Sequence, residues 1–427
     1  MFLQSKTARS PVSKPTKDNM DKQTYCVLPY NHLSIDPQGQ VRPCCNYNFH
    51  KQSFKDTGWK FKSIWDSDNL NELLQGEPHI ELRKDVEANH KHSFCDRCWV
   101  SEDNGGESYR NMWNNSFGCT TPETFQRQVK IEYVEFTLGN KCNIQCRMCN
   151  PWSSSMWADE IYKNPQLDFW ETGAHLDKTK FEWYDTPQFD KIFNEILPTL
   201  KHVNMLGGEP LFNAKYYDIL QKIIDSGRAG EIVLQFNSNM LAIQDKVYDL
   251  WQHFKLVQIN MSCDGVEGVN EYVRWPGKWS KWERNLNRVF EWQQKLGSDK
   301  LSLQIHSTLS SLTWLDLGNL YRYTQTLPIM FQLPFLIQVT QPAMMDAIHL
   351  PQPIKDKGYE QAIQALENSG AEEWEVSNNR SLLEHVMNTE RNPDLWEMFI
   401  NETNKLDKVR NQSILTYVPE YQEYWHE

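Results

Sequence analysis

Short apolar runs alternate with longer amphipathic stretches between about residue 130 and residue 340. The runs have the length of buried strands, and the stretches between them repeat apolar residues at helical spacing. The expected strands are Glu132–Leu138, His202–Leu206, Glu231–Phe236, Leu256–Met261, Leu301–Thr308 and Phe335–Thr340. The expected helices between them are Phe189–Leu197, Tyr216–Asp225, Trp282–Gln294 and Leu315–Thr324. Because successive strand and helix units build parallel sheets, this pattern predicts an α/β fold with an open, partial (β/α)6 barrel.

The segments on either side of this barrel have different patterns. Residues 1–22 are polar and aperiodic, which is typical of a mobile tail. From Tyr25 to about Trp99, short extended pieces, a turn at Asp36–Gly39 and a helical stretch at Asn69–Leu74 separate two groups of cysteines, which indicates a small metal-stapled module. Beyond residue 350 we expect three charged helices, at Gly358–Asn368, Arg380–Met387 and Asp394–Val409. The expected parts are a tail (1–22), a cysteine-rich module (23–128), the barrel (129–348) and a helical C-terminal extension (349–427).

Composition and charge narrow the class of protein. Hydrophobic residues make up 39% and the chain has 17 Trp, 17 Tyr and 19 Phe, which indicates a globular protein with an aromatic-rich interior or pocket. A net charge of −12 disfavours a nucleic-acid partner, because phosphate backbones are bound mainly by Lys and Arg. Neither a membrane-spanning stretch nor an apolar signal segment is evident, so we expect a cytoplasmic protein without a membrane partner. Cytosolic thiols stay reduced, so the ten cysteines favour metal binding over disulfides.

Three closely spaced cysteines follow the first expected strand of the barrel. Cys142, Cys146 and Cys149 form a CxxxCxxC run in the loop at the end of that strand. Loops at the carboxyl ends of parallel strands build active sites, so three thiolates there can converge on one metal centre. A 4Fe-4S cubane needs four iron ligands, and three cysteines leave one iron open for another molecule. The alternatives are buried thiols or three ligands of a structural zinc.

These cysteines resemble the signature of the radical S-adenosylmethionine (SAM) superfamily, which has CxxxCxxC after the first strand of a partial barrel. The run Leu206–Pro210 closes the second expected strand and looks like the family's GGEP motif. The resemblance implies that Gly207, Gly208, Glu209 and Pro210 hold the methionyl amino group of SAM, with glycines allowing close backbone approach.

Further positions are similar to the same family. Ser262, Asp264 and Arg274 follow the fourth strand, as do the family's serine, its DG pair and its downstream arginine. The resemblance implies that Ser262 and Arg274 contact the ribose and carboxylate of SAM, and an arginine fork suits a carboxylate. Ser238 stands where relatives often carry Thr-Asn-Gly. Met148 replaces a residue that is usually aromatic and near the adenine, an apolar role that methionine can fill.

A second group of cysteines precedes the barrel. Cys26, the doublet Cys44-Cys45, and Cys95 with Cys98 resemble a twitch domain, the shortened SPASM domain, which relatives usually place after the barrel. The resemblance implies an auxiliary 4Fe-4S cluster on Cys26, Cys44, Cys95 and Cys98, with Cys45 as the substitute for Cys44. A four-cysteine zinc site is the alternative. Cys119 and Cys263 have no partner spacing and are interpreted as small apolar residues, and His202, His306 and His349 as strand or loop residues.

The family resemblance implies an enzyme that reductively cleaves SAM to a 5′-deoxyadenosyl radical and abstracts hydrogen from a substrate. It also implies an electron donor such as flavodoxin or ferredoxin. Twitch and SPASM relatives suggest a peptide or protein substrate, by analogy alone. One alternative is radical oxidation or rearrangement of a small molecule such as a sugar or alcohol. The other is a zinc-stabilised, non-enzymatic binding protein. The sequence names no general base.

Overall fold

The computed structural model describes residues 24–103, 106–119, 121, 124–125, 127–170 and 176–425. The tail expected over 1–22 lies outside the described residues. The chain forms two compact units, each described by itself below. The first unit comprises Met1–Gly139, Thr179–Asn204 and Ser226–Val233. The second unit comprises Asn140–Lys178, Met205–Asp225 and Leu234–Glu427.

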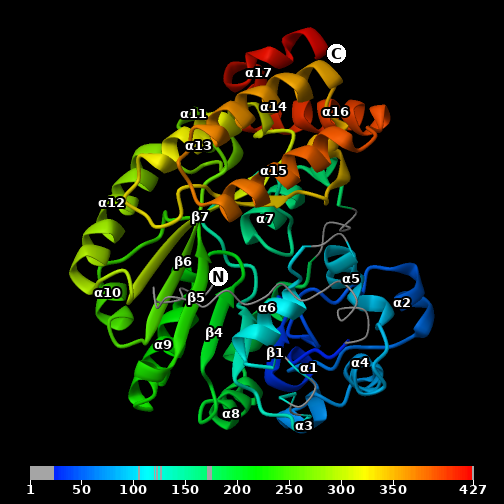
Figure 1. Ribbon diagram of the computed structural model, residues 1–427, viewed down its shortest axis with the longest axis vertical. Helices are drawn as coiled ribbons and strands as arrows, with labels where there is room; N and C mark the ends of the chain where they lie inside the picture. Colours follow the sequence, from blue (N-terminus) through cyan, green and yellow to red (C-terminus); the bar gives the residue numbers. More distant parts are fainter. Residues whose placement is uncertain are drawn as a thin grey trace. The chain divides into compact units, whose positions relative to one another are not determined.

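The described strands form an open sheet in the order β2-β1-β3-β4-β5-β6-β7-β8 (Figure 1). Their bounds are β1 His32–Ile35, β2 Val41–Arg42, β3 Tyr133–Thr137, β4 His202–Leu206, β5 Val233–Ser238, β6 Leu256–Ser262, β7 Leu301–Leu309 and β8 Phe335–Gln338. All six strands expected from the sequence are present, with ends that differ by at most two residues. Two further strands, β1 and β2, lie where the sequence predicts short extended pieces without giving their bounds.

Strand β1 lies in the first unit, where it pairs antiparallel with β2 and parallel with β3. Its four residues are all buried, yet His32 and Ser34 interrupt the apolar run, so the segment lacks the pattern of a buried strand. The turn between β1 and β2 is the one expected from the sequence, because the Asp36 carboxylate accepts hydrogen bonds from the backbone N–H groups of Gln38 and Gln40. The first unit's helices are α1 Leu28–Asn31, α2 Gln52–Thr57, α3 Leu70–Leu73, α4 Glu77–Glu87, α5 Asp96–Asp103, α6 Tyr109–Ser116 and α8 Pro187–Ile196.

The second unit has parallel strands whose two faces differ. Strand β7 alternates buried and half-buried residues along its whole length, and it pairs parallel with β6 and β8. Its buried face carries Leu301, Leu303, Ile305 and Leu309, and helix α12 packs against this strand. The unit's barrel helices are α7 Ser155–Lys163, α9 Ala214–Asp225, α10 Lys246–Trp251, α11 Gly268–Val273, α12 Trp279–Leu296 and α13 Leu317–Gln325.

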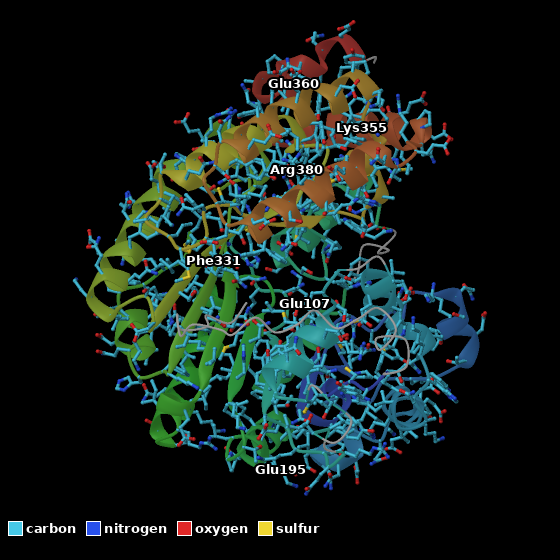
Figure 2. The ribbon with its side chains drawn as sticks, viewed as in Figure 1. Glu107, Glu195, Phe331, Lys355, Glu360 and Arg380 are labelled. Atoms are coloured by element: carbon cyan, nitrogen blue, oxygen red, sulfur yellow. The ribbon has the colours of Figure 1, made fainter. Side chains whose placement is uncertain are left out.

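The C-terminal part of the second unit is helical, as the sequence predicts. Its helices are α14 Gln352–Glu367, α15 Glu373–Asn388, α16 Pro393–Arg410 and α17 Ile414–Tyr417 (orange to red in Figure 1). Lys355 of α14, labelled in Figure 2, donates hydrogen bonds from its ammonium to the backbone oxygens of Val386 and Thr389 at 3.1 and 3.4 Å. A buried lysine that caps the end of the next helix ties α14 to α15.

Candidate cluster and cofactor sites

Backbone hydrogen bonds hold the three-cysteine loop of the second unit. The N–H groups of Gln145 and Arg147 donate to the backbone oxygens of Trp275 and Val273 at 2.9 and 2.8 Å. The oxygen of Cys146 accepts from the Cys149 N–H at 3.0 Å and from the Trp157 indole N–H at 2.6 Å. The loop is thus fixed through its main chain, which leaves the three thiols available as ligands.

Cys142 is buried, and Cys146 and Cys149 are half-buried. Burial raises the pKa of Cys142, Cys146 and Cys149, that of Cys149 to about 12, and the neighbouring cysteines raise the pKa of Cys142 further. The Arg274 guanidinium lies 3.9 Å from the sulfur of Cys146 and opposes the rise there. Thiols that repel one another as anions are suited to a cationic metal centre, which would bind them all as thiolates.

The donors at this site are cysteine thiols, the ligand type that binds iron-sulfur clusters. Within the described ranges, no three His, Cys, Asp or Glu side chains stand ready to surround one metal ion. The thiolates of a cubane bind different iron atoms and need not converge on one point. All ten cysteines are described and all are free thiols, so none of the expected ligands is committed to a disulfide.

The Gly-Gly turn after β4 lies against the start of the cysteine loop. Gly207 and Gly208 have φ values of 95° and 52°, and the Glu209 N–H donates to the backbone oxygen of Lys141 at 2.9 Å. A Cβ atom on Gly208 would lie 2.0 Å from that same oxygen. Glycine is required here by both conformation and space. Pro210 is buried and begins a short 3-10 helix, Pro210–Phe212.

Glu209 is a buried carboxylate at the end of this turn. It accepts hydrogen bonds from the Ser238 hydroxyl at 2.8 Å, the Asn239 N–H at 2.6 Å and the Leu211 N–H at 3.2 Å. Burial raises its pKa to about 7, although these donors oppose the rise. A buried carboxylate with neutral donors alone is suited to an ammonium group, which would restore its charge. The site therefore fits the amino group of SAM.

Arg274 and Asp264 form a second buried pair beside the cysteines. Nε of Arg274 lies 2.6 Å from a carboxylate oxygen of Asp264, whose other oxygen accepts from the Thr308 N–H at 2.6 Å. Ser262 ends β6 and is half-buried, and so is Met148 in the cysteine loop. The structure thus brings Cys146, Arg274 and Asp264 together. Contacts of Ser262, Arg274 and Met148 with SAM remain predictions.

Sequence reasoning did not predict several side-chain contacts that hold the loop, although Asn239 belongs to the Asn237–Asn239 run that aligns with the family's Thr-Asn-Gly. Asn239 donates from its amide to the Asn143 side-chain oxygen at 2.8 Å, which links the end of β5 to the cysteine loop. Arg147, inside the CxxxCxxC run, is fully buried and pairs with Asp407 of α16 at 2.5 Å. The spacing of the cysteines gives no signal for a partner 260 residues away.

Four cysteines of the first unit line one small cavity. Cys26 precedes α1, Cys44 follows β2, and Cys95 and Cys98 flank the start of α5. Burial raises the pKa of Cys26, to about 12, and also that of Cys95 and Cys98. Arg110 lines the same cavity and opposes this rise at Cys26. Buried thiols beside a fixed cation suit an anionic iron-sulfur cluster.

Arg110 is held in place by two partners. It makes a two-pronged pair with Glu102, at 3.0 and 2.6 Å, and donates to the backbone oxygen of Tyr25 at 2.7 Å. Tyr25 precedes Cys26 in the chain, so the arginine stands beside the first cysteine of the group. The fork geometry fixes the direction of the guanidinium.

The cysteine doublet separates into two environments. Cys44 lines the cavity, whereas Cys45 is absent from its lining and lies close enough to Glu135 of β3 to lower the pKa of that carboxyl. Burial raises the pKa of Glu135, and the hydroxyl of Tyr133 donates to it at 3.2 Å. The arrangement favours Cys44 over Cys45 as the fourth cysteine ligand of a metal centre in this cavity.

The two remaining cysteines, Cys119 and Cys263, are buried. Cys119 packs in a hydrophobic cluster with Val27 and Trp113. The sulfur of Cys263 lies 3.2 Å from the backbone oxygen of Gly265, and the residue is fully buried. Both positions agree with the interpretation as small apolar residues.

Two family models match the chain. The model described as "Radical SAM superfamily" matches residues 136–295, and the SPASM model, "Iron-sulfur cluster-binding domain", matches residues 26–99. The matched regions contain the three-cysteine loop and the four-cysteine cavity, respectively. The chain therefore contains a SPASM domain followed by a radical SAM domain. The former domain type binds auxiliary iron-sulfur clusters, and the latter binds a 4Fe-4S cluster and SAM.

Solved structures with weak similarity were also found. "Native anSMEcpe with bound AdoMet and Cp18Cys peptide" is 13% identical, with 55% of this chain and 58% of that chain covered and a TM-score of 0.33. Streptococcus suis SuiB bound to S-adenosylmethionine is 12% identical, with 57% and 46% covered and a TM-score of 0.34. The alignments span about half the length of these proteins. No curated protein matches the chain in sequence. Over the described part, none of the helices is both long and apolar enough to span a membrane.

Proposed function

We propose that this chain cleaves SAM reductively and uses the resulting radical to abstract hydrogen from a peptide or protein substrate. The observation that carries the proposal is the grouping of three cysteines of one loop, the Gly-Gly turn and Arg274 within one compact unit. When bound, an open 4Fe-4S cluster and SAM supply a one-electron cleavage that yields a 5′-deoxyadenosyl radical. An external one-electron donor, such as flavodoxin or ferredoxin, is part of this proposal.

The residues of the second unit would bind the cluster and orient SAM. Cys142, Cys146 and Cys149 would hold the cluster, with one iron left open to SAM. Glu209 would receive the amino group of SAM, a role supported by its burial and by the Ser238 and Asn239 donors that fix its carboxylate.

The remaining SAM contacts are proposed from position. Gly207, Gly208 and Pro210 would shape the turn that faces the amino acid part of SAM. Ser262 and Arg274 would contact the ribose and carboxylate, and Met148 the adenine. In this role the Arg274 guanidinium would contact both SAM and Asp264. One carboxylate oxygen of Asp264 pairs with Arg274, and the other accepts a hydrogen bond from the Thr308 N–H.

The first unit would hold the auxiliary cluster. Cys26, Cys44, Cys95 and Cys98 line one cavity, and the cation of Arg110 faces the same space. A fixed cation favours the more reduced, more negative form of a cluster, so this site is suited to accept an electron. Oxidation of a substrate radical needs such an acceptor.

A polar sheet face in the second unit supports a substrate rich in hydrogen-bonding groups. On β6 and β7, Asn260 stands opposite Gln304, and Ser262 stands opposite His306. Burial lowers the pKa of His306 to about 3, so its imidazole is neutral at physiological pH. Side chains that can donate and accept in one row can pair with peptide amide groups.

Apolar side chains border this polar row on the neighbouring strand. Phe335 and Ile337 of β8 are about half exposed, and in the register of the sheet they stand opposite His306 and Thr308. An apolar edge beside a row of amide and imidazole groups is suited to a peptide, whose side chains and backbone present both kinds of surface.

The test is anaerobic reconstitution with iron and sulfide, followed by incubation with SAM and dithionite and mass spectrometry of the products. We expect 5′-deoxyadenosine and methionine from the native chain and neither from the variant with Cys142, Cys146 and Cys149 changed to Ala. Candidate peptides should accelerate 5′-deoxyadenosine formation more than sugars or alcohols do. Equal formation by the native chain and the triple variant would refute the proposal, and acceleration by small molecules alone would refute its substrate class.

A further inference from the structure

The C-terminal helix α16 reaches the three-cysteine loop through a buried ion pair. Asp407 of α16 lies 2.5 Å from the guanidinium of Arg147, which stands between Cys146 and Cys149. Side chains of this pair are only 9% and 1% exposed. The Tyr272 hydroxyl also donates to Asp407 at 2.9 Å, and the Arg147 guanidinium lies 3.6 Å from the centre of the Tyr272 ring. The arginine of the loop is thus clamped between α16 and the segment that leads to Arg274.

A second buried ion pair on the same helix contacts α7, the helix that follows the cysteine loop. Arg410 makes a two-pronged contact with Glu160 of α7, at 3.0 and 2.6 Å, and its guanidinium lies 5.0 Å from the Trp157 ring centre. The indole N–H of Trp157 donates to the backbone oxygen of Cys146 at 2.6 Å. Arg410 therefore fixes the ring that hydrogen-bonds a ligand cysteine.

Apolar contacts join the same elements. Leu406 of α16 belongs to a buried cluster with Trp157, Ile161 and Leu167, and Cys149 and Val409 pack against this cluster. The helix thus meets the loop with one apolar residue cluster and two charged side chains one turn apart.

Buried ion pairs stabilise the attachment of a helix less effectively than apolar packing does. Burying an arginine and a carboxylate carries a large desolvation cost, and well-packed apolar residues of similar volume stabilise as well or better. Arg147 belongs to the cysteine loop and also donates from Nε to the backbone oxygen of Tyr272. Arg410 lies beside Trp157, whose indole N–H donates to the backbone oxygen of Cys146. Directional, buried pairs at this location indicate that they fix the geometry of the cysteine loop.

We propose that α16 is a positioning element for the radical chemistry, with Asp407 and Arg410 as positioning residues that hold the cysteine loop through Arg147 and Trp157. The inference rests on the proposed function, because it assigns the C-terminal extension a role at the SAM-binding cluster. The extension is then required for a correctly formed open cluster and not for the auxiliary cluster.

The test uses the full chain, reconstituted anaerobically. Asp407→Asn keeps the shape of the side chain and removes its charge. Trp157→Phe keeps a smaller aromatic ring at this position and removes the indole N–H that reaches Cys146. Glu397→Gln is the matched control, because Glu397 lies on α16 and is exposed. Iron loss to a chelator and electron paramagnetic resonance (EPR) spectra with and without SAM are recorded. The variant with Cys142, Cys146 and Cys149 changed to Ala supplies the spectrum of the auxiliary cluster alone.

We expect Asp407→Asn and Trp157→Phe to lose the iron of one cluster about 10-fold faster than the native chain, as removal of a partner that orients a metal ligand does elsewhere. The SAM-induced change in the EPR spectrum should weaken in parallel. The auxiliary signal and the control variant should stay unchanged. Asp407→Glu, which restores the charge, should recover part of the SAM response.

Native rates of iron loss and a native SAM response in both variants would overturn the inference. Loss of both clusters together with a lowered melting temperature would also overturn it, because it would show general unfolding. Trp157→Phe decides the case if Asp407→Asn does not fold. The proposed function fails separately, if the native chain forms no 5′-deoxyadenosine while these iron-retention measurements behave as expected.

Discussion

Substitution of Gly208 by Ala tests the fit between the Gly-Gly turn and the cysteine loop. The new Cβ would lie 2.0 Å from the Lys141 backbone oxygen, at a residue with φ of 52°. The left-handed conformation costs an alanine roughly 1–2 kcal/mol. Moving the turn away from Lys141 also breaks the Glu209 N–H bond to the same oxygen, which adds about 1 kcal/mol. The SAM-free protein relieves this strain by displacing the turn, and SAM binding must restore it, so the total of about 2–3 kcal/mol weakens SAM binding roughly 30- to 140-fold.

Gly370→Ala provides the matched control. Gly370 also has a positive φ, 62°, but a Cβ there meets nothing within 4 Å. The assay is equilibrium binding of SAM to the reconstituted protein, with melting temperature recorded for both variants. Gly370→Ala should lower the melting temperature slightly and leave SAM affinity unchanged. The reasoning is refuted if Gly208→Ala binds SAM as tightly as Gly370→Ala does.

Two further predictions concern single side chains. Because the folded-state pKa of Glu209 is about 7 against an ordinary 4.5, the SAM-free protein should lose stability as pH rises from 4.5 to 7, by at most roughly 3 kcal/mol. Glu209→Gln should flatten that slope in denaturant titrations, and an unchanged slope would contradict the assignment. SAM affinity of the native protein should fall below pH 7, as the carboxylate becomes neutral. Cys44→Ser should lose the auxiliary iron and Cys45→Ser should retain it in metal analysis, and the reverse result would reassign the ligand.

The barrel strands were predictable because each has a continuous apolar run. Leu256–Ser262 and Leu301–Leu309 were found to within one residue of the expected ends. Strand β1 falls among the short extended pieces expected in the cysteine-rich module, but its bounds were not predictable, because His32 and Ser34 break its apolar pattern and both are buried in a strand that pairs with β3. Pairing between strands 100 residues apart leaves no local pattern in the sequence.

The cysteines of both sites were predictable by type and spacing, but their surroundings were not. The sequence does not distinguish Cys44 from its neighbour Cys45, and only the structure shows that Cys44 lines the cavity and Cys45 does not. Arg147 and Asp407 carry no pattern that connects them, because burial of a charge becomes visible only when its partner is placed. Side chains that orient a site from distant elements are therefore the part that sequence spacing misses.

The most direct test of the central claim is the EPR spectrum of the dithionite-reduced protein recorded with and without SAM. An open cluster on Cys142, Cys146 and Cys149 has an iron that SAM can bind, so one of two overlapping signals should change when SAM is added. That signal should be missing from the variant with all three cysteines changed to Ala. A spectrum that SAM leaves unchanged, or a protein that contains zinc in place of iron, would contradict the account.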